Sequence, residues 1–221
     1  MRLWLCLSSM NKICFVFGAG EIRNAKIKEN SLIISADGGY EYLKKNNITP
    51  HIILGDFDSL GYVPKGENVI VYPAVKDSTD MALAVEKGIK LGCETFVLYG
   101  GMGGRIDHTL ANIQLLSLLA EKGKKGYLVD TENVVTAICN SQITFSKEYI
   151  GFISVFSHSN KSEGVSIKGL KYELNDQTLL NNVALGVSNE FIGKESIISV
   201  KNGTLIITYK HQTEKFIDDI K

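Results

Sequence analysis

The sequence has little of what marks specialised protein classes. Its 221 residues include four cysteines, three prolines and one tryptophan, and 24 Lys and Arg residues balance 24 Asp and Glu residues. The cysteines are far apart, so neither a structural zinc site nor a disulfide framework is expected. The formal net charge of zero gives no electrostatic indication of a nucleic-acid or membrane partner. We therefore expect a soluble globular protein of the reducing cytoplasm.

The N-terminus, MRLWLCLSSM, contains one arginine and a short apolar stretch, which is a faint likeness to a signal peptide. The apolar run is short, and residues 12–20 already have the pattern of a first buried strand. No run approaches the roughly 20 apolar residues of a membrane span. We expect no signal peptide, and we interpret residues 1–9 as an upstream extension or tail, since a start at Met10 would give MNKICFVFGAG.

Up to about residue 130, short β-branched runs alternate with helical stretches. The expected strands cover residues 13–18, 31–35, 51–55, 68–72, 95–100 and 126–130, and their continuous apolar character is typical of strands buried on both faces of a parallel sheet. At least two helices are expected, and the two convincing ones start near Asp77 and Asp107. The apolar stripe of the first is Met81, Ala84, Val85, Gly88 and Ile89, and that of the second is Leu110, Ile113, Leu116 and Ala120. This pattern predicts an α/β fold with a mostly parallel, doubly wound sheet.

After about residue 135 the chain changes to short alternating runs with no convincing helix before the charged C-terminus. Residues 201–204, Lys-Asn-Gly-Thr, lie between two such runs and predict a β-hairpin with a type I′ turn. The second domain is therefore expected to be an antiparallel β-sandwich. We place the α/β domain at residues 1–136 and the β-sandwich at residues 137–221.

Polar residues gather directly after the expected strands, where ligands bind in open parallel sheets. Asp37 follows the second strand, Asp56 and Asp58 follow the third, and Asp80 lies in a segment after the fourth. The i, i+2 spacing of Asp56 and Asp58 puts both carboxylates on one side of an extended segment, as a hard cation such as Mg²⁺ prefers. A solvated turn with an Asx cap is the alternative for this pair alone. Four converging carboxylates repel one another unless a cation or proton compensates, which favours a metal site.

A glycine-rich stretch, GGMGGR, occupies residues 100–105 between the fifth strand and the second helix. It fits neither the Walker A pattern nor the dinucleotide fingerprint, but its amides and the helix N-terminus suit phosphate. Arg105 can grip phosphate oxygens bidentately, and His108 can contact phosphate or nucleotide. The alternatives are a flexible surface turn for the loop, and capping by Asp107 with a surface His108. Asp77 and Asp80 likewise fit a plain helix N-terminus, which leaves Lys76 and Thr79 unexplained.

The motifs ADGG (36–39), LGDFDS (54–59), KDSTD (76–80) and GGMGGRIDHTLANI (100–113), followed by a β domain with an SNE segment at 188–190, resemble the thiamine pyrophosphokinase family. The resemblance implies a homodimeric enzyme that transfers the diphosphoryl group of ATP to thiamine, giving AMP and thiamine diphosphate. It implies an α/β nucleotide domain, a C-terminal β-sandwich and a thiamine pocket between subunits. The implied partners are therefore thiamine and ATP, and the implied cofactor is Mg²⁺.

Carried onto this sequence, the resemblance assigns the metal-binding and diphosphate-proximal carboxylates to Asp37, Asp56, Asp58 and Asp80. The residues implied for catalysis are Asp56, Asp58, Asp80 and Arg105. Nucleotide or phosphate contacts are implied for Asp37, Gly38, Gly39, Lys76, Thr79, Gly101, Gly103, Gly104, Arg105, Asp107 and His108. Thiamine contacts are implied for Asp80, Ser188 and Asn189. Some family members stack a tryptophan on thiamine, but Trp4 is the single tryptophan here, so that partner is unassigned.

Two other functions stay open on the residues alone. A Mg²⁺-dependent hydrolase of nucleotides or thiamine phosphates would use the same carboxylates with water as the nucleophile. A non-catalytic nucleotide-sensing module would need a phosphate grip but has little use for four clustered aspartates. Dependence of AMP formation on thiamine separates the kinase from the hydrolase, and loss of turnover on neutralising Asp58 separates it from the sensor.

Overall fold

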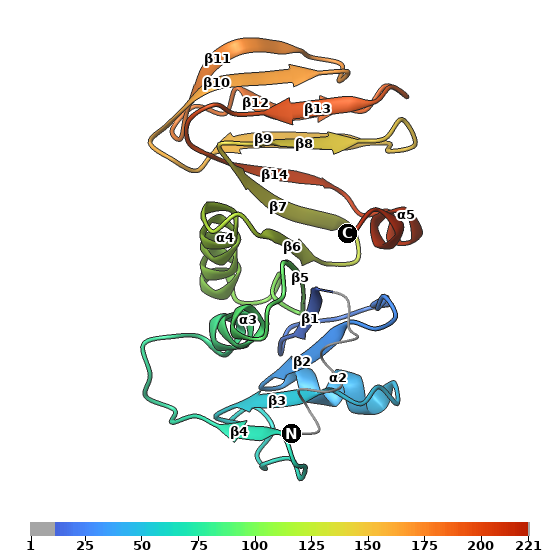
Figure 1. The fold of residues 1–221 in the computed structure, drawn as a ribbon, viewed down its shortest axis with the longest axis vertical. Helices are drawn as coiled ribbons and strands as arrows, with labels where there is room; N and C mark the ends of the chain where they lie inside the picture. Colours follow the sequence, from blue (N-terminus) through green and yellow to red (C-terminus); the bar gives the residue numbers. More distant parts are fainter. Residues whose placement is uncertain (1–11, 221) are drawn as a thin grey trace. The chain divides into compact units, whose positions relative to one another are not determined.

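A computed structural model describes residues 12–220, and the chain forms two compact units (Figure 1). The first unit comprises the described residues up to Asn112, together with Leu128–Thr131 and the residues from Thr213 onward. The second comprises Ile113–Tyr127 and Glu132–Gln212. The interpretation of residues 1–9 as a tail without a signal peptide lies outside the described residues, as does Trp4. Within the described range, no helix combines the length and apolar character that crossing a membrane requires.

The N-terminal part of the chain alternates strands and helices as expected. Its elements are β1 (Ile13–Phe17), β2 (Leu32–Ala36), α2 (Gly39–Lys45), β3 (Ile52–Gly55), β4 (Val69–Val71), α3 (Asp80–Lys90), β5 (Thr95–Tyr99), α4 (Ile106–Glu121) and β6 (Lys125–Val129). Parallel pairing gives the order β5-β1-β2-β3-β4, and Figure 1 shows α2 and α3 on opposite sides of these strands. The order reverses between β1 and β5, which is where ligands bind in such sheets.

Burial along the parallel sheet follows the apolar runs, with one exception. All five residues of β1 and of β5 are buried, as the sequence predicted. The expectation of burial on both faces is wrong for β4, whose Val71 is 59% exposed. β4 is the edge strand of the sheet, so its side chains lack a neighbouring strand on one side.

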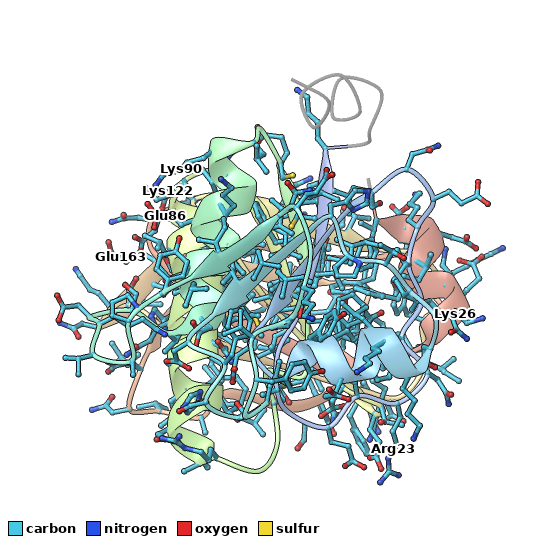
Figure 2. All side chains as sticks on the ribbon, turned by 90° about the horizontal axis from the view of Figure 1, so that it is seen from below. Arg23, Lys26, Glu86, Lys90, Lys122 and Glu163 are labelled. Carbon is cyan, nitrogen blue, oxygen red and sulfur yellow. The ribbon has the colours of Figure 1, made fainter. Side chains whose placement is uncertain are left out.

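Helix α3 begins at Asp80, three residues later than predicted, because Thr79 caps it. The Thr79 side-chain oxygen accepts a hydrogen bond from the Ala82 amide at 3.2 Å, which satisfies one of the free amides of the first turn. The predicted stripe is confirmed for Met81, Ala84, Val85 and Gly88, which are buried. On the outer face of α3, the Glu86 and Lys90 side chains form an ion pair of 2.6 Å (Figure 2).

The predicted stripe of helix α4 is confirmed only in part: Leu116 and Ala120 are buried, whereas Ile113 is half-buried. Leu110 is 56% exposed, and the buried apolar residues are Leu115, Leu116, Leu119 and Ala120. Apolar residues occur on several faces of α4, so spacing alone did not define which face is inward. The short helix α2 was not predicted at all.

The second unit contains the C-terminal antiparallel strands, namely β7 (Asn133–Cys139), β8 (Gln142–Phe145), β9 (Phe152–Ser157), β10 (Lys161–Lys168), β11 (Leu174–Leu180), β12 (Gly186–Glu190), β13 (Ser196–Ser199) and β14 (Thr204–Lys210). They pair in the orders β12-β9-β14-β7 and β11-β10-β13-β8. Between the two layers, the ring of Phe145 on β8 packs edge-on at 5.0 Å from that of Tyr209 on β14. The predicted fold class, a mostly parallel α/β part followed by an antiparallel β-sandwich, is confirmed. The chain ends in helix α5 (Thr213–Asp219).

The predicted hairpin at residues 201–204 is wrong. β13 pairs with β8 and β10, whereas β14 pairs with β7 and β9, so the Asn202-Gly203 turn carries the chain from one sheet to the other. Asn202 instead forms an isolated bridge with Glu163 on β10. Each flanking strand has its own alternating apolar face, and that pattern is equally satisfied when the two strands join different sheets.

Candidate active site

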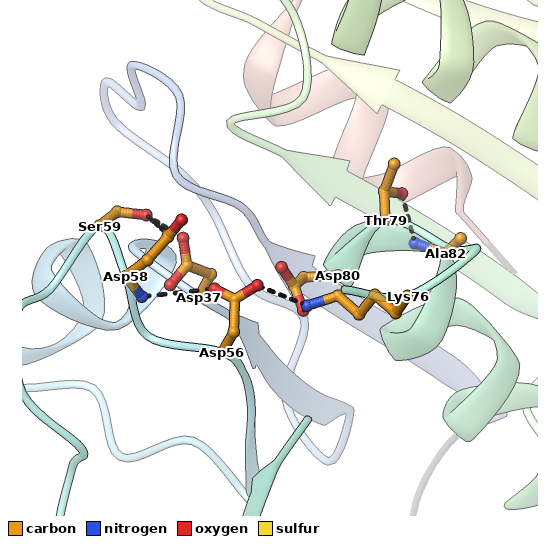
Figure 3. A network of polar contacts seen from close by, with 8 residues as sticks. All are labelled: Asp37, Asp56, Asp58, Ser59, Lys76, Thr79, Asp80 and Ala82. Carbon is orange, nitrogen blue, oxygen red and sulfur yellow. Dashed lines mark hydrogen bonds and ion pairs between the residues drawn. The ribbon is translucent and has the colours of Figure 1, made fainter. Parts of the chain in front are cut away.

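Three carboxylates meet where β2 and β3 end (Figure 3). Asp37 directly follows β2, and Asp56 and Asp58 follow β3. One oxygen from each of the three lies within 4.8 Å of the others. The parallel pairing of β2 with β3 brings their carboxyl ends to the same edge of the sheet, as the sequence analysis expected.

The backbone that presents these carboxylates differs from the extended segment we predicted. Phe57, between the two aspartates, has a φ of +62° and is only 2% exposed, and Asp37 has a φ of +47°. The Asp58 amide also donates to Asp56 Oδ1 at 3.3 Å, so the Asx turn considered as an alternative is present. Left-handed backbone at such residues is uncommon and is often found at functional sites. The buried Phe57 ring anchors the turn that carries Asp56 and Asp58.

Asp37 has the least solvent access of the three carboxylates. The residue is 8% exposed, and its Oδ1 atom is buried without a hydrogen-bond partner among the described residues. Its Oδ2 atom accepts a hydrogen bond from the Ser59 hydroxyl, which also lies 3.4 Å from Asp58 Oδ1. Burying a carboxylate oxygen without a hydrogen-bond donor destabilises the folded protein. A hard cation bound to that oxygen would remove this cost, because such cations prefer oxygen ligands. The donor set therefore fits Mg²⁺.

Lys76 connects this group to Asp80. Its ammonium nitrogen lies 2.7 Å from Asp56 Oδ2 and 2.9 Å from Asp80 Oδ1, and the three side chains are 14 to 20% exposed. The hydrogen bond from Lys76 lowers the pKa of Asp56. Partial burial acts to lower the pKa of Lys76, but its two carboxylate partners outweigh burial and raise it. Burial raises the pKa of Asp80 despite the nearby lysine.

The structure thus joins four predicted residues, Asp37, Asp56, Asp58 and Lys76, into one network, with Asp80 on its far side (Figure 3). Asp80 is not part of the group of three carboxylates that lie within 4.8 Å of one another. Lys76 supplies one positive charge to this group and contacts two of its four carboxylates, which lowers their mutual repulsion. Ser59 belongs to the quoted LGDFDS motif, yet its hydrogen bond to Asp37 was not foreseen.

Glycines allow close backbone approaches around the ends of β1, β2 and β5. A Cβ atom on Gly39 would collide with the carbonyl of Phe17, and one on Gly38 would lie 2.9 Å from Ala19 Cβ. A Cβ atom on Gly101 would lie 2.6 Å from Leu128 Cδ1. Gly38, Gly39 and Gly101 therefore have a packing function.

The loop after β5 is fixed by Asn112, a residue for which the sequence predicts no role. Asn112 on α4 is 4% exposed, and its amide nitrogen donates to the Gly101 carbonyl at 2.8 Å. Beyond this point the loop is open, because Gly103 and Gly104 have φ angles of +79° and +59° and no neighbouring atom near a Cβ position. The loop is held at one end and free at its tip.

Arg105, Asp107 and His108 form a local group at the start of α4. Arg105 makes a two-point contact with Asp107, with nitrogen to oxygen distances of 3.2 and 2.6 Å, and both side chains are exposed. The hydrogen bond from Arg105 lowers the pKa of Asp107. The His108 amide donates to Asp107 at 3.0 Å, but Asp107 is the second residue of α4 and not its N-cap. The His108 side chain is exposed, as the capping alternative expected. An exposed guanidinium in this position can exchange its carboxylate partner for phosphate.

The two β-domain residues, Ser188 and Asn189, lie on β12 in different environments. Ser188 is exposed, has a φ of +59°, and its amide donates to Ser154 Oγ at 3.1 Å. Asn189 is 3% exposed, and its side chain hydrogen-bonds the backbone of Tyr172. Tyr172 itself is 61% exposed and was not among the predicted residues, because a lone tyrosine after a strand carries no motif.

Comparisons with known proteins agree with this architecture. Residues 24–128 match the family model described as "Thiamin pyrophosphokinase, catalytic domain", and residues 140–205 match "Thiamin pyrophosphokinase, vitamin B1 binding domain". A curated thiamine pyrophosphokinase from Bacillus subtilis is 31% identical over 186 residues, covering 81% of this chain and 87% of the relative.

Solved structures give the same result. A crystal structure of thiamine pyrophosphokinase from Bacillus subtilis superimposes with a TM-score of 0.80 at 26% identity, covering 90% of this chain and 99% of that one. A thiamin pyrophosphokinase from Geobacillus thermodenitrificans superimposes with a TM-score of 0.79 at 25% identity, covering 92% and 99%. The chain belongs to the thiamin pyrophosphokinase family, whose enzymes make thiamine diphosphate by pyrophosphoryl transfer.

Proposed function

We propose that this chain transfers the diphosphoryl group of ATP to the hydroxyethyl oxygen of thiamine, giving thiamine diphosphate and AMP in a Mg²⁺-dependent reaction. Family membership supports the kinase activity. The observation that carries the metal and nucleotide part of the proposal is the group Asp37, Asp56 and Asp58 with its buried, unpartnered Asp37 oxygen. We place the catalytic domain at residues 1–136 and the thiamine-binding domain at residues 137–221.

The metal ligands in this proposal are Asp37, Asp56 and Asp58, with Asp80 as a fourth candidate beyond Lys76. Mg²⁺ takes one or two carboxylates and fills its other positions with water and substrate phosphate. When bound, it would offset the negative charge on the phosphate oxygens. One oxygen from each of the first three carboxylates lies within 4.8 Å of the others, which supports such an ion, whereas Asp80 lies outside that group.

The chain's own residues supply positioning and charge. Transfer at the β-phosphorus needs in-line alignment and neutralisation of the non-bridging oxygens more than covalent help. Lys76 is a protonated donor at the carboxylate cluster, and Arg105 with the amides of the loop after β5 would hold the nucleotide phosphates. Asp80 is the candidate that orients the attacking hydroxyl, because its ion pair of 2.9 Å with Lys76 holds the carboxylate in place. Nucleotide contacts are proposed for Gly38, Gly39, Thr79, Gly101, Gly103, Gly104, Asp107 and His108.

Thiamine recognition is proposed for Ser188 on β12 and for Tyr172, which precedes β11. Ser188 offers an exposed hydroxyl, and Tyr172 offers an exposed aromatic ring within the region that matches the vitamin B1 binding model. A flat ring is suited to stacking on the aromatic rings of thiamine. Tyr172 is thus our candidate for the residue that stacks on thiamine, a role for which the sequence offered no suitable tryptophan.

A homodimer with thiamine bound between subunits is part of the same proposal. The outer face of β9 and β12 exposes Phe152 (59%), Phe156 (38%) and Val187 (40%). Exposed large apolar residues on neighbouring strands are a feature of interaction surfaces, and a second copy of this chain would cover them. We propose a cytoplasmic location on the few, widely spaced cysteines, and neither nucleic acid nor a membrane as partner on the balanced charge of the chain.

The experiment that tests the proposal measures both products. Purified protein is incubated with ATP, thiamine and Mg²⁺, and AMP and thiamine diphosphate are quantified together. We expect equal amounts of the two products, and none when thiamine is omitted or Mg²⁺ is chelated. AMP or phosphate formed without thiamine would indicate the hydrolase instead, and ATP binding without turnover would indicate the sensing module.

A further inference from the structure

Asn189 has almost no hydrogen-bonding capacity left for a ligand. Its Nδ2 atom donates to the Tyr172 carbonyl at 2.6 Å, and its Oδ1 atom accepts from the amides of Tyr172 and Glu190, each at 2.9 Å. An asparagine side chain has two donor hydrogens and two acceptor lone pairs, so three of these four positions are satisfied within the chain. The residue is also 3% exposed, which leaves little surface for a substrate to touch.

A local irregularity in β12 separates Asn189 from its neighbour. The pairing with β9 shifts register between Gly186 and Asn189, and Ser188 sits at this bulge with a φ of +59°. In a regular strand, alternate residues face opposite sides. Here Val187 and Ser188 are both exposed and Asn189 is buried, because the bulge inserts an extra residue and redirects the side chains.

The contacts of Asn189 attach the segment before β11 to the end of β12. We call the two hydrogen bonds between the Asn189 side chain and the Tyr172 backbone the bracket. Next to it, the Lys171 amide donates to the Glu190 carbonyl at 3.0 Å, and the Lys171 ammonium group pairs with the Glu190 carboxylate at 2.7 Å. That ammonium group also lies 5.8 Å from the centroid of the Tyr172 ring. The exposed Tyr172 ring is therefore fixed through its own backbone and through Lys171, and the exposed Ser188 directly precedes Asn189 on β12.

We propose that Asn189 is a positioning residue that holds the backbone of Tyr172 against β12, so that Tyr172 and Ser188 present one surface to the acceptor substrate. The inference rests on the proposed function, and it replaces the direct contact between Asn189 and thiamine that the family resemblance implied. The acceptor recognised by this surface would be a flat heteroaromatic compound. Asn189 itself does not touch it.

The bracket is tested first without any activity measurement. Hydrogen exchange is followed at the Tyr172 amide in the full chain, in the wild type and in Asn189→Ala, with Asn181→Ala as an exposed asparagine control. We expect the Tyr172 amide to exchange at least about tenfold faster in Asn189→Ala, because its acceptor is gone, and no change in Asn181→Ala. Unchanged exchange in Asn189→Ala would overturn the proposal. This readout stands even if the chain proves not to be a thiamine kinase.

The functional consequence is tested by a double-mutant cycle. We expect Asn189→Ala to raise KM for thiamine about tenfold while kcat and KM for ATP stay within about threefold. This pattern indicates weaker binding of thiamine without a loss in the chemical step. Asn189→Asp should behave similarly, since it replaces the donor that faces the Tyr172 carbonyl with an acceptor. If Asn189→Ala does not fold, Asn189→Leu, which is similar in size and has neither donor nor acceptor, takes its place in both experiments.

In the Tyr172→Ala background, Asn189→Ala should raise KM for thiamine by less than about twofold, because the ring it positions is absent. Full additivity of the two substitutions would show that Asn189 contacts thiamine independently, and would refute the positioning role. Absence of thiamine-dependent turnover in the wild type would count against the proposed function and leave the exchange experiment to decide the bracket.

Discussion

The ammonium nitrogen of Lys76 lies 2.7 Å from a carboxylate oxygen of Asp56, within a group of acidic residues that would otherwise repel one another. The same nitrogen is 2.9 Å from Asp80, so one lysine compensates carboxylates from two segments of the chain. The arrangement keeps Lys76 protonated and Asp56 ionised near neutral pH, as the directions of their pKa shifts indicate. An ionised carboxylate and a fixed cation are what a metal and phosphate site requires.

Replacing Lys76 with methionine removes this compensation. We expect Lys76→Met to lower kcat/KM by about 100-fold or more, the usual effect of losing a charged group that stabilises the transition state. The melting temperature should also fall, because two partly buried carboxylates lose their counter-ion. Steady-state kinetics and thermal unfolding measure the two effects. Lys90→Met is the control, since Lys90 is exposed and pairs only on the helix surface; activity retained within a few-fold in Lys76→Met would contradict the role given to Lys76.

Binding of Mg²⁺ should stabilise the folded protein through Asp37. A ligand present at about 100 times its dissociation constant stabilises the native state by about 2.7 kcal/mol. We expect the melting temperature of the wild type to rise with Mg²⁺ and that of Asp37→Asn to stay constant. Asp176→Asn is a matched control, because Asp176 is an exposed aspartate that also has a positive φ. Equal Mg²⁺ shifts in the wild type and Asp37→Asn would remove Asp37 from the metal site.

The tight packing at Gly101 predicts a stability cost for a single methyl group. The Cβ atom of Gly101→Ala would lie 2.6 Å from Leu128 Cδ1 and 2.8 Å from Asn112 Nδ2, so the side chains or the loop must shift. We expect a loss of about 1 to 3 kcal/mol of unfolding free energy, measured by chemical denaturation, together with a higher KM for ATP. Gly66→Ala, whose nearest contact would be an ordinary 3.5 Å, should be close to neutral; equal effects of the two substitutions would argue against the packing role.

His51 predicts a dependence of stability on pH outside the active site. Burial lowers its pKa, and its Nδ1 atom accepts a hydrogen bond from the Ile33 amide at 3.0 Å. Because the folded pKa is below the unfolded value of about 6.5, the unfolded chain binds the proton first as the pH falls. The stabilisation is therefore complete above pH 6.5 and decreases as the pH falls toward and through the folded pKa.

The variant His51→Asn keeps an acceptor that has no proton to gain in this range. Its melting temperature should vary less than that of the wild type between about pH 7 and pH 5, in thermal unfolding at fixed ionic strength. His158→Asn is the matched control, because His158 is an exposed histidine. The same pH profile for His51→Asn and the wild type would show that His51 does not contribute.

Strands and the order of the acidic motifs could be read from the sequence, because buried parallel strands are continuous apolar runs and their carboxyl ends share an edge. The turn geometry could not. Nothing in the LGDFDS motif signals a buried, left-handed Phe57, because that conformation depends on the core into which the ring packs.

The pairing of strands that are far apart in the chain could not be predicted from the sequence either. The Asn202-Gly203 signal is local, but whether β13 and β14 pair with each other depends on strands far away in sequence. Asn189 was assigned to thiamine because the SNE segment resembles the family pattern. Its burial and its bracket on Tyr172 involve a residue 17 positions earlier, which no local pattern reveals.

The most direct test of the central claim is AMP release from ATP and Mg²⁺ with and without thiamine, in the wild type, Asp58→Asn and Asp176→Asn. We expect thiamine-dependent AMP from the wild type and from Asp176→Asn, and at least about a 100-fold slower rate from Asp58→Asn. Undiminished AMP release by Asp58→Asn, or AMP release by the wild type that ignores thiamine, would contradict diphosphoryl transfer at the carboxylate cluster.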